Sequence, residues 1–220
     1  MEIIIKNIYQ DVIRLSTNQM IGVMGIKRNK LLSLKNASIV SKWDLFYTND
    51  IEKELYLYEK DTNKIMQVLK DFNYDENYLY QKINSLSIGD KHLLRYIIAI
   101  LENKDVLIID EPFQDLDYAM KKMIISLLKR MIYHEKKTIF LLSNDSDIIY
   151  ELCQNTLIMQ DNNYVYGKTL DLLNNPKILD EEKIMIPRII EFINNVKNKN
   201  ILINYSNDIR DLIKDVYKCV

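Results

Sequence analysis

Short runs of consecutive apolar residues alternate along the chain with stretches in which apolar positions recur every three or four residues. The apolar runs, which predict strands, are residues 2–5, 19–24, 105–110, 138–142 and 156–159. The helical periodicity covers residues 92–101, 118–133 and 147–153. Strands that alternate with helices in this way are typical of βαβ units. The pattern therefore predicts an α/β fold with a mostly parallel sheet flanked by helices.

Two segments depart from this alternation. Residues 49–84 are polar, tyrosine-rich and helical in period, with no signal of a buried strand, and they predict an inserted helical subdomain at about residues 49–92. After Pro176, two short helices surround the extended run ILINY at 201–205. We expect a main domain at 1–177 and a small C-terminal α/β extension at 178–220.

Composition and charge narrow the class of protein. The 220 residues are 48% apolar, and 30 basic against 31 acidic side chains give a net charge of −1, which argues against a nucleic-acid partner. Cys153 and Cys219 lack CxxC spacing and no signal peptide is evident, so we expect a reducing cytoplasm. No apolar run approaches about 18 residues, so no membrane span is predicted.

Two acidic residues end the most apolar of the predicted strands. The sequence VLIIDEP at 106–112 is followed by FQDLD at 113–117. Asp110 and Glu111 would lie at the carboxyl edge of a parallel sheet, where open α/β proteins bind ligands. Such a pair can hold Mg²⁺ and polarise an attacking water. The alternative is an acidic strand end that starts a turn, with Pro112 as the stop.

A serine and a glycine precede the predicted helix upstream of this strand. In LSIGDKHLL at 86–94, the first backbone N–H groups and the positive end of the helix dipole would point at one spot and favour an anion. The alternative is an ordinary N-cap, with Ser87 or Asp90 opening the helix.

Taken together, residues 86–117 resemble the block of ABC-type ATPases that runs from the signature LSGGQ through a helix to DEP and a loop ending in LD. The resemblance implies a P-loop NTPase-like fold that uses ATP and Mg²⁺. It assigns Asp110 to Mg²⁺ through water and Glu111 to the attacking water. The signature residues Ser87, Gly89 and Asp90, with Asp117 of the D-loop, would contact the ATP of a partner chain.

The resemblance also implies a phosphate loop of the form GxxxxGK[ST], and QMIGVMGIKRNKLL at 19–32 stands in its place. Lys27 replaces the second glycine, Arg28 the lysine and Asn29 the Mg²⁺-binding Ser/Thr. A Cβ at the glycine costs about 1 kcal/mol or more, and arginine is longer and planar where a point donor is needed. We interpret the site as degenerate, although its basic residues still attract polyphosphate. The assigned residues are Gly22, Gly25, Lys27, Arg28, Asn29 and Lys30.

Other positions of the family pattern are altered too. In SND at 143–145, Asn144 occupies the place of the switch histidine. No loop glutamine is found; the nearest positions are Ile39 and Val40, and Leu45 with the next residue resembles the LF segment that follows that loop. Gly167 is expected at the turn after the last strand. The region after residue 186 is similar to the C-terminal extension of energy-coupling factor ATPases, which drive import of vitamins and metal ions.

Three hypotheses follow from the resemblance. In the leading one, the chain pairs with a competent homologous ATPase and offers Ser87 and Gly89 to that partner's ATP. In the second, it hydrolyses ATP slowly by itself, with Arg28 in place of lysine and Glu111 activating water. In the third, it is a non-catalytic scaffold or regulatory subunit that docks on a membrane protein through its helical subdomain. The expected partners are a homologous ATPase and a transmembrane transporter subunit, at the cytoplasmic face of a bacterial membrane, with no nucleic acid.

Overall fold

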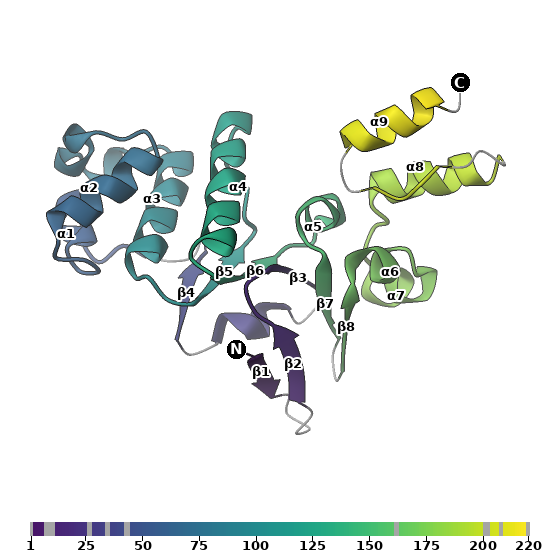
Figure 1. The fold of residues 1–220 in the computed structure, drawn as a ribbon. Helices are drawn as coiled ribbons and strands as arrows, with labels where there is room; N and C mark the ends of the chain where they lie inside the picture. The colour runs from purple at the N-terminus through teal and green to yellow at the C-terminus, as the bar shows by residue number, and fades with distance from the viewer. Residues whose placement is uncertain are drawn as a thin grey trace. The chain divides into compact units, whose positions relative to one another are not determined.

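A computed structural model describes residues 2–6, 12–25, 28–33, 36–41, 45–160, 163–199, 203–206 and 209–218 of the chain. The chain divides into two compact units. Unit 1 comprises Met1–Gln19 and Leu32–Phe140, and unit 2 comprises Met20–Leu31 and Leu141–Val220. The predicted fold class is confirmed, because parallel strands and helices alternate through both units (Figure 1).

The strands of unit 1 follow the order β4-β5-β6. β4 (Ala37–Val40) lies parallel to β5 (Val106–Asp110), with Val40 opposite Ile109. The backbone N–H of Thr138, at the start of β6 (Thr138–Leu142), donates to the Asp105 carbonyl at 2.9 Å. β5 and β6 are almost wholly buried, as expected of apolar parallel strands covered on both faces. A separate antiparallel pair is formed by β1 (Glu2–Lys6) and β2 (Val12–Ser16).

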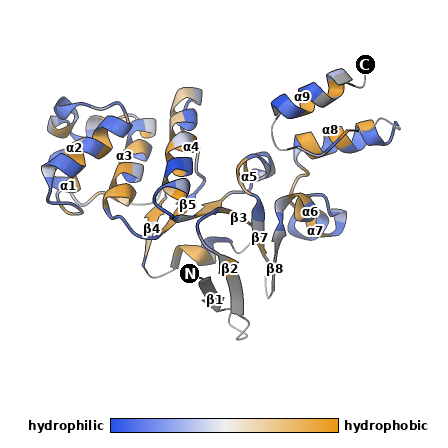
Figure 2. Ribbon diagram, viewed as in Figure 1, coloured by the Kyte–Doolittle hydropathy of each residue, from blue (hydrophilic) through white to orange (hydrophobic). Residues whose placement is uncertain are grey.

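Residues 51–85, all of which the structure describes, contain helices and no strand beyond a bridge between Asp50 and Lys82. The elements are α1 (Ile51–Leu55), α2 (Thr62–Asp71) and the 3₁₀ helices η2 (Glu76–Tyr80) and η3 (Ile83–Ser85). α2 buries Ile65 and Leu69, and it contacts α3 (Ile88–Leu101). Figure 2 shows much of α1 and α2 as hydrophilic and β4 and β5 as apolar. An amphipathic helix of this kind is held by packing its apolar stripe.

The two long helices of unit 1 match the periodicity of the sequence. α4 (Tyr118–Tyr133) has the predicted bounds. α3 begins at Ile88, one turn earlier than predicted, because Ser87 caps it by accepting from the Asp90 backbone N–H. Arg130 of α4 forms a two-pronged ion pair with Asp71 of α2, in which Nη1 lies 2.9 Å from Oδ1. This pair joins the two helices at the surface.

In unit 2 the end of β6 is followed in strand order by β3, β7 and β8. β3 (Met20–Met24) is buried along its whole length and lies parallel to β7 (Asn155–Met159). β8 (Tyr164–Lys168) runs antiparallel to β7. The first three helices of the unit are α5 (Ser146–Leu152), α6 (Thr169–Leu173) and α7 (Pro176–Glu182).

The prediction for Gly167 is wrong. This glycine lies inside β8, opposite Thr156, and not at a turn. A Cβ built on Gly167 would lie 3.7 Å from the Leu172 side chain, an ordinary contact. The position therefore has no need of glycine, and a glycine in a strand was mistaken for a turn signal.

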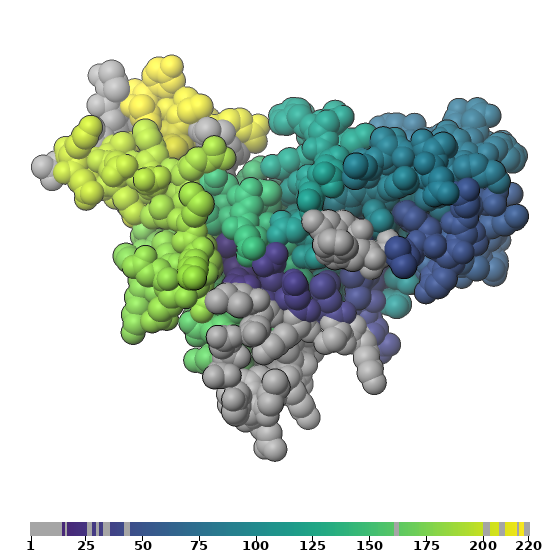
Figure 3. Space-filling view, turned by 180° about the vertical axis from the view of Figure 1, so that it is seen from behind, coloured from purple at the N-terminus to yellow at the C-terminus, as the bar shows by residue number. Residues whose placement is uncertain are grey.

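The C-terminal helices α8 (Arg188–Lys197) and α9 (Ile209–Lys218) enclose a small apolar cluster of Ile193, Ile203 and Leu212. Figure 3 shows α9, in yellow, against α8, in light green. Residues 203–205 of the predicted extended run have no regular secondary structure, and residues 201–202 lie outside the described part of the chain. The predicted domain boundary at 177–178 falls inside α7.

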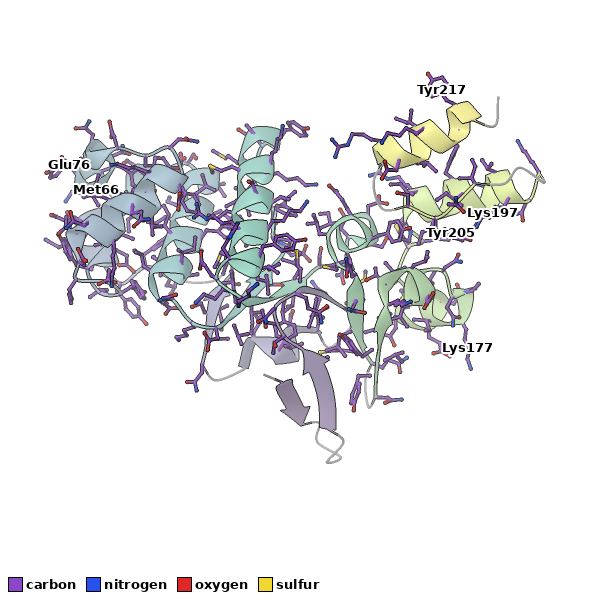
Figure 4. All side chains as sticks on the ribbon, in the orientation of Figure 1. Met66, Glu76, Lys177, Lys197, Tyr205 and Tyr217 are labelled. Carbon is purple, nitrogen blue, oxygen red and sulfur yellow. The ribbon has the colours of Figure 1, made fainter. Side chains whose placement is uncertain are left out.

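Three side chains close a ring of hydrogen bonds beside this cluster. The Tyr205 hydroxyl donates to Asn194 Oδ1 at 2.6 Å, Asn194 Nδ2 donates to Asn174 Oδ1 at 2.8 Å, and Asn174 Nδ2 donates to the Tyr205 hydroxyl at 3.3 Å. Lys197 Nζ lies 3.5 Å from the centre of the Tyr205 ring (Figure 4). The ring of bonds ties the loop before α7 to α8 and to the segment before α9. No helix in the described part of the chain is both long and apolar enough to cross a bilayer.

Gly25 and Gly167 provide a matched test of the unit 2 backbone. Gly25 has φ +97°, and a Cβ there would lie 2.5 Å from the Met159 carbonyl oxygen. Gly25→Ala should therefore lower the free energy of unfolding by about 2 kcal/mol or more, which is a fall in Tm of about 4 °C or more. Gly167→Ala should leave Tm within about 2 °C, because its Cβ has room. Equal Tm values for the two variants by scanning calorimetry would contradict this description of the turn.

Candidate functional site

The segment after β3 is the one that the sequence resemblance assigns to a phosphate loop. Gly25 follows the strand in a left-handed conformation, and its carbonyl oxygen accepts from the Arg28 backbone N–H at 3.3 Å. Arg28 then begins a six-residue 3₁₀ helix, η1 (Arg28–Ser33). Residue 27, the lysine predicted to replace a glycine, lies outside the described residues, as does the Lys30 side chain.

Gly22 lies within β3, before this turn. It is opposite Thr156 of β7, and a Cβ on it would lie 2.5 Å from the Ile149 side chain of α5. The missing side chain lets α5 pack directly on the strand. The absence of a side chain at Gly22 therefore serves the packing of α5 against β3.

Two substituted positions of the family pattern meet in unit 2. Arg28 Nη1 donates to Asn144 Oδ1 at 2.8 Å. Asn144 is held by its neighbours, since Ser143 Oγ accepts from the Asp145 N–H and Asp145 caps α5. The residue predicted to replace the loop lysine is thus hydrogen-bonded to the residue predicted to replace the switch histidine. Asn29, at the Ser/Thr position, is exposed.

In unit 1 the signature serine both caps α3 and bonds to its own helix. Ser87 Oγ accepts from the Asp90 N–H at 3.1 Å and donates to Asp90 Oδ2 at 2.6 Å. The Tyr74 hydroxyl donates to Asp90 Oδ1 at 2.9 Å, and its ring stacks on Tyr78 at 3.8 Å. Burial and the bond to Asp90 raise the pKa of Tyr74. The ordinary N-cap weighed from the sequence is therefore present, and the Ser87 hydroxyl is hydrogen-bonded to Asp90.

The two carboxylates lie where the sequence predicts them. Asp110 is the last residue of β5 and only 7% exposed, and Glu111 follows it with φ +52°. A non-glycine residue in this region is strained, and such strain is often found at functional sites. Mg²⁺ is usually held by one or two carboxylates together with phosphate and water, which fits Asp110. In the described residues no group of three or more metal-binding side chains converges.

The loop between Glu111 and α4 lies against the first turn of α3. Asp117 accepts from the Met120 N–H at 2.8 Å and so caps α4. A Cβ on Gly89 would lie 3.0 Å from the Asp115 carbonyl oxygen. The signature glycine thus allows close packing within unit 1. Sequence reasoning found Gly89 and Asp117 but not this contact.

A groove of about 500 Å³ in unit 1 was missed at the sequence level. Leu45 and Tyr47 on its edge are 89% and 81% exposed. The buried Glu54 carboxylate accepts from the backbone N–H of Tyr47 at 3.2 Å and so holds this edge in place. The groove is lined by Ala37, Ile39, Leu45, Phe46, Tyr47, Tyr58, Arg95, Ile98 and Glu102. Ile39 and Val40, the positions nearest the expected loop glutamine, lie in β4.

Comparison with curated proteins gives homologues of one kind. The chain is 32% identical over 116 residues to an uncharacterized ABC transporter ATP-binding protein of Methanocaldococcus jannaschii, covering 48% of the chain and 44% of that protein. It is 24% identical over 162 residues to the energy-coupling factor transporter ATP-binding protein EcfA2 of Staphylococcus epidermidis, covering 70% and 57%. The chain thus spans about half the length of the curated relatives it matches. No protein-family model matches the chain.

Solved structures give the same fold. An ATP-binding subunit of an ABC transporter superposes with a TM-score of 0.66 at 16% identity, covering 80% of this chain and 90% of the other. The cbiO1 part of the Clostridium perfringens cbiONQ transporter complex gives 0.63 at 16% identity, covering 84% and 91%. The sequence resemblance is confirmed: the homologues of this chain are ATP-binding proteins of ABC transporters, energy-coupling factor ATPases among them, and its fold is that of ABC ATPase domains.

Proposed function

We propose that this chain is the ATP-binding-cassette subunit of an energy-coupling factor-like membrane transporter. In this role it pairs with a homologous ATPase whose phosphate loop is intact and completes that partner's ATP site through Ser87 and Gly89. Its own loop contributes little or no hydrolysis. The pair lies at the cytoplasmic face of the membrane and couples ATP hydrolysis to solute uptake.

The contrast between two helix starts carries the proposal. α3 has 14 residues and a capped N-terminus at Ser87, so its first N–H groups and dipole favour an anion. After β3, the helix that the described residues form is the six-residue 3₁₀ helix η1, whose first side chain, Arg28, is bonded to Asn144. A long helix presents a stronger site for phosphate than one 3₁₀ segment does.

Two features would weaken nucleotide binding at the chain's own loop: the Arg28–Asn144 hydrogen bond and the absence of the lysine and Ser/Thr of the family pattern. The Arg28–Asn144 hydrogen bond is exposed, and a bond of this kind contributes about 1 kcal/mol, so its loss on nucleotide binding is a modest penalty. The absence of the lysine and of the Ser/Thr hydroxyl removes direct ligands of phosphate and Mg²⁺. The missing direct ligands therefore weaken nucleotide binding more than the Arg28–Asn144 hydrogen bond does. Asp110 and Glu111 keep the residue types that hold Mg²⁺ and orient water.

At the partner's site the chain's groups act by charge stabilisation. The Ser87 hydroxyl and the first N–H groups of α3 would donate to the γ-phosphate oxygens, on which negative charge is spread during phosphoryl transfer. Asp90 opposes this effect. Its carboxylate lies one residue after Gly89 and accepts a hydrogen bond from the Ser87 hydroxyl. To complete the partner's site, the Ser87 hydroxyl therefore has to break its hydrogen bond to Asp90 and donate to a phosphate oxygen instead.

The groove in unit 1 favours a second role, that of a scaffold docked to the transmembrane subunit. Leu45 and Tyr47 offer exposed apolar surface, while Arg95 and Glu102 supply charges of both signs. Arg95 lies over the Phe46 ring at 4.9 Å, which orders that wall. A short amphipathic segment of the transmembrane subunit fits such a surface. The two roles are compatible, and only the first requires the signature.

Ser87 is the residue whose change tests the completed site. In a heterodimer reconstituted with a homologue of intact phosphate loop, Ser87→Arg should lower ATPase turnover at least about ten-fold, because the side chain fills the space of the γ-phosphate. Ser87→Asp keeps an N-cap acceptor and should lower turnover similarly through charge repulsion. The control Ser85→Arg changes an exposed serine of η3 and should leave turnover unchanged.

The outcome of this assay separates the two roles. If all three variants hydrolyse ATP like the wild type and Leu45→Asp alone prevents assembly with the transmembrane subunit, the chain is a scaffold and the completed-site proposal is wrong.

Removal of the Asp90 charge should strengthen ATP binding in the same heterodimer. Two like charges about 4 Å apart in water repel by about 1 kcal/mol, which corresponds to about five-fold in affinity. Asp90→Asn should lower the KM for ATP by about that factor. Asp75→Asn, a change at the cap of η2, should leave KM unchanged. A raised KM in Asp90→Asn would show that the carboxylate assists binding.

A further inference from the structure

The loop that follows β5 is fixed by two side chains of α3. His92 Nδ1 lies 2.7 Å from the Gln114 carbonyl oxygen, and the Tyr96 hydroxyl donates to the Pro112 carbonyl oxygen at 2.6 Å. Because a carbonyl oxygen only accepts, the hydrogen of the neutral His92 ring lies on Nδ1. Neither carbonyl belongs to a strand or helix, so these side chains satisfy backbone groups that the fold leaves open.

Both side chains are held firmly. His92 is 3% exposed and Tyr96 is fully buried, and their rings stack with centroids 5.4 Å apart. Burial lowers the pKa of His92, and the nearby Arg95 charge lowers it further. The neutral ring that makes the bond is therefore favoured at pH 7. Stacking restricts both rings to the orientation that the two bonds need.

The loop itself would not keep its shape unaided. Glu111 and Asp115 both have positive φ, +52° and +62°, and each such residue costs about 1 kcal/mol or more. Within the loop the Gln114 N–H donates to the Glu111 carbonyl at 3.2 Å and the Leu116 N–H donates to that of Phe113 at 3.3 Å. These two long bonds offset little of the strain. The contacts to α3 supply the remaining restraint.

The three points of contact lie on one face of α3. Gly89, His92 and Tyr96 are spaced by three and four residues, which places them on one side of a helix. Gly89 meets the loop at Asp115, His92 at Gln114 and Tyr96 at Pro112. The helix and the loop therefore run side by side over two turns of α3. The start of α3 carries Ser87, and the ends of the loop carry Glu111 and Asp117.

We propose that His92 and Tyr96 are positioning residues that hold the loop 111–117 against α3, so that the signature and the D-loop face the partner as one rigid surface. The kinetic part of this inference rests on the proposed function. The structural part concerns this chain alone. Both side chains are buried, so their proposed role is to position the loop.

Hydrogen exchange tests the structural part in the isolated chain. Tyr96→Phe removes one hydroxyl, and His92→Leu removes the donor to Gln114. Both should speed exchange of the Gln114 and Leu116 amides about five-fold relative to amides of β5, as expected from the loss of about 1 kcal/mol. His92→Asn places an amide donor near the position of Nδ1 and should restore slow exchange. Tyr133→Phe, which removes the hydroxyl of a 68% exposed tyrosine at the end of α4, is the matched control.

ATPase kinetics of the heterodimer test the functional part. Tyr96→Phe and His92→Leu should lower kcat about ten-fold with KM within about two-fold, because positioning of the transition state is lost while ground-state binding is kept. His92→Asn and Tyr133→Phe should keep the wild-type kcat. A purely structural role would lower Tm and leave kcat unchanged at a temperature where the variants are folded.

Hydrogen exchange decides the structural part of the proposal, and the ATPase kinetics decide the functional part. Unchanged loop exchange in both Tyr96→Phe and His92→Leu overturns the positioning role. Faster exchange with unchanged kcat overturns its link to turnover, provided that Ser87→Arg abolishes turnover in the same assay. If Ser87→Arg has no effect, the proposed function fails, and loop exchange alone then supports or overturns the positioning role.

Discussion

The contact between the loop after β5 and the first turns of α3 is the interaction on which the rest of the account depends. Residue 89 has no Cβ, and a Cβ there would lie 3.0 Å from the Asp115 carbonyl oxygen, so the loop would have to shift by a few tenths of an ångström. Such a shift would act on the same loop that carries the Gln114 and Pro112 carbonyls. The chain has only four glycines, and Gly89 allows the start of α3 to pack closely against the loop that follows β5.

The two segments that the proposal assigns to phosphate binding differ in their local chemistry. The α3 start keeps a serine cap, a glycine and a long helix, although Asp90 weakens it for an anion. The segment after β3 keeps Gly25 with its left-handed backbone but lacks the lysine and Ser/Thr of the GK[ST] pattern, and its arginine is bonded to Asn144. A site built from two chains tolerates this division, because each chain needs only one working half. The asymmetry thus follows from local chemistry in each unit considered alone.

Much of the fold could be predicted, because parallel strands buried on both faces leave long apolar runs and amphipathic helices leave a period near 3.6. β5, β6 and α4 lie where the pattern places them. β4 was missed because ASIV is only four residues long and contains a polar serine, which is buried beside β5. Gly167 was misplaced because a glycine in a strand and one in a turn look alike in sequence.

The site was predictable to the level of residue types. Asp110, Glu111, Ser87 and Gly89 follow from motif spacing, which tertiary structure does not change. The bonds of His92 and Tyr96 to backbone carbonyls could not be predicted, since a carbonyl is present at every residue and only the path of the loop selects which one a side chain meets. The Arg28–Asn144 bond joins residues 116 apart and likewise depends on the fold.

The central claim is that ATP is bound at the partner's phosphate loop and the signature of this chain, and not at this chain's own loop. Isothermal titration calorimetry with Mg²⁺-ATP, on the chain alone and on its equimolar mixture with a homologue of intact phosphate loop, tests it directly. The account predicts no binding heat from the chain alone at millimolar ATP and one nucleotide bound per heterodimer in the mixture. Tight Mg²⁺-ATP binding by the isolated chain, or two nucleotides of equal affinity per heterodimer, would contradict it.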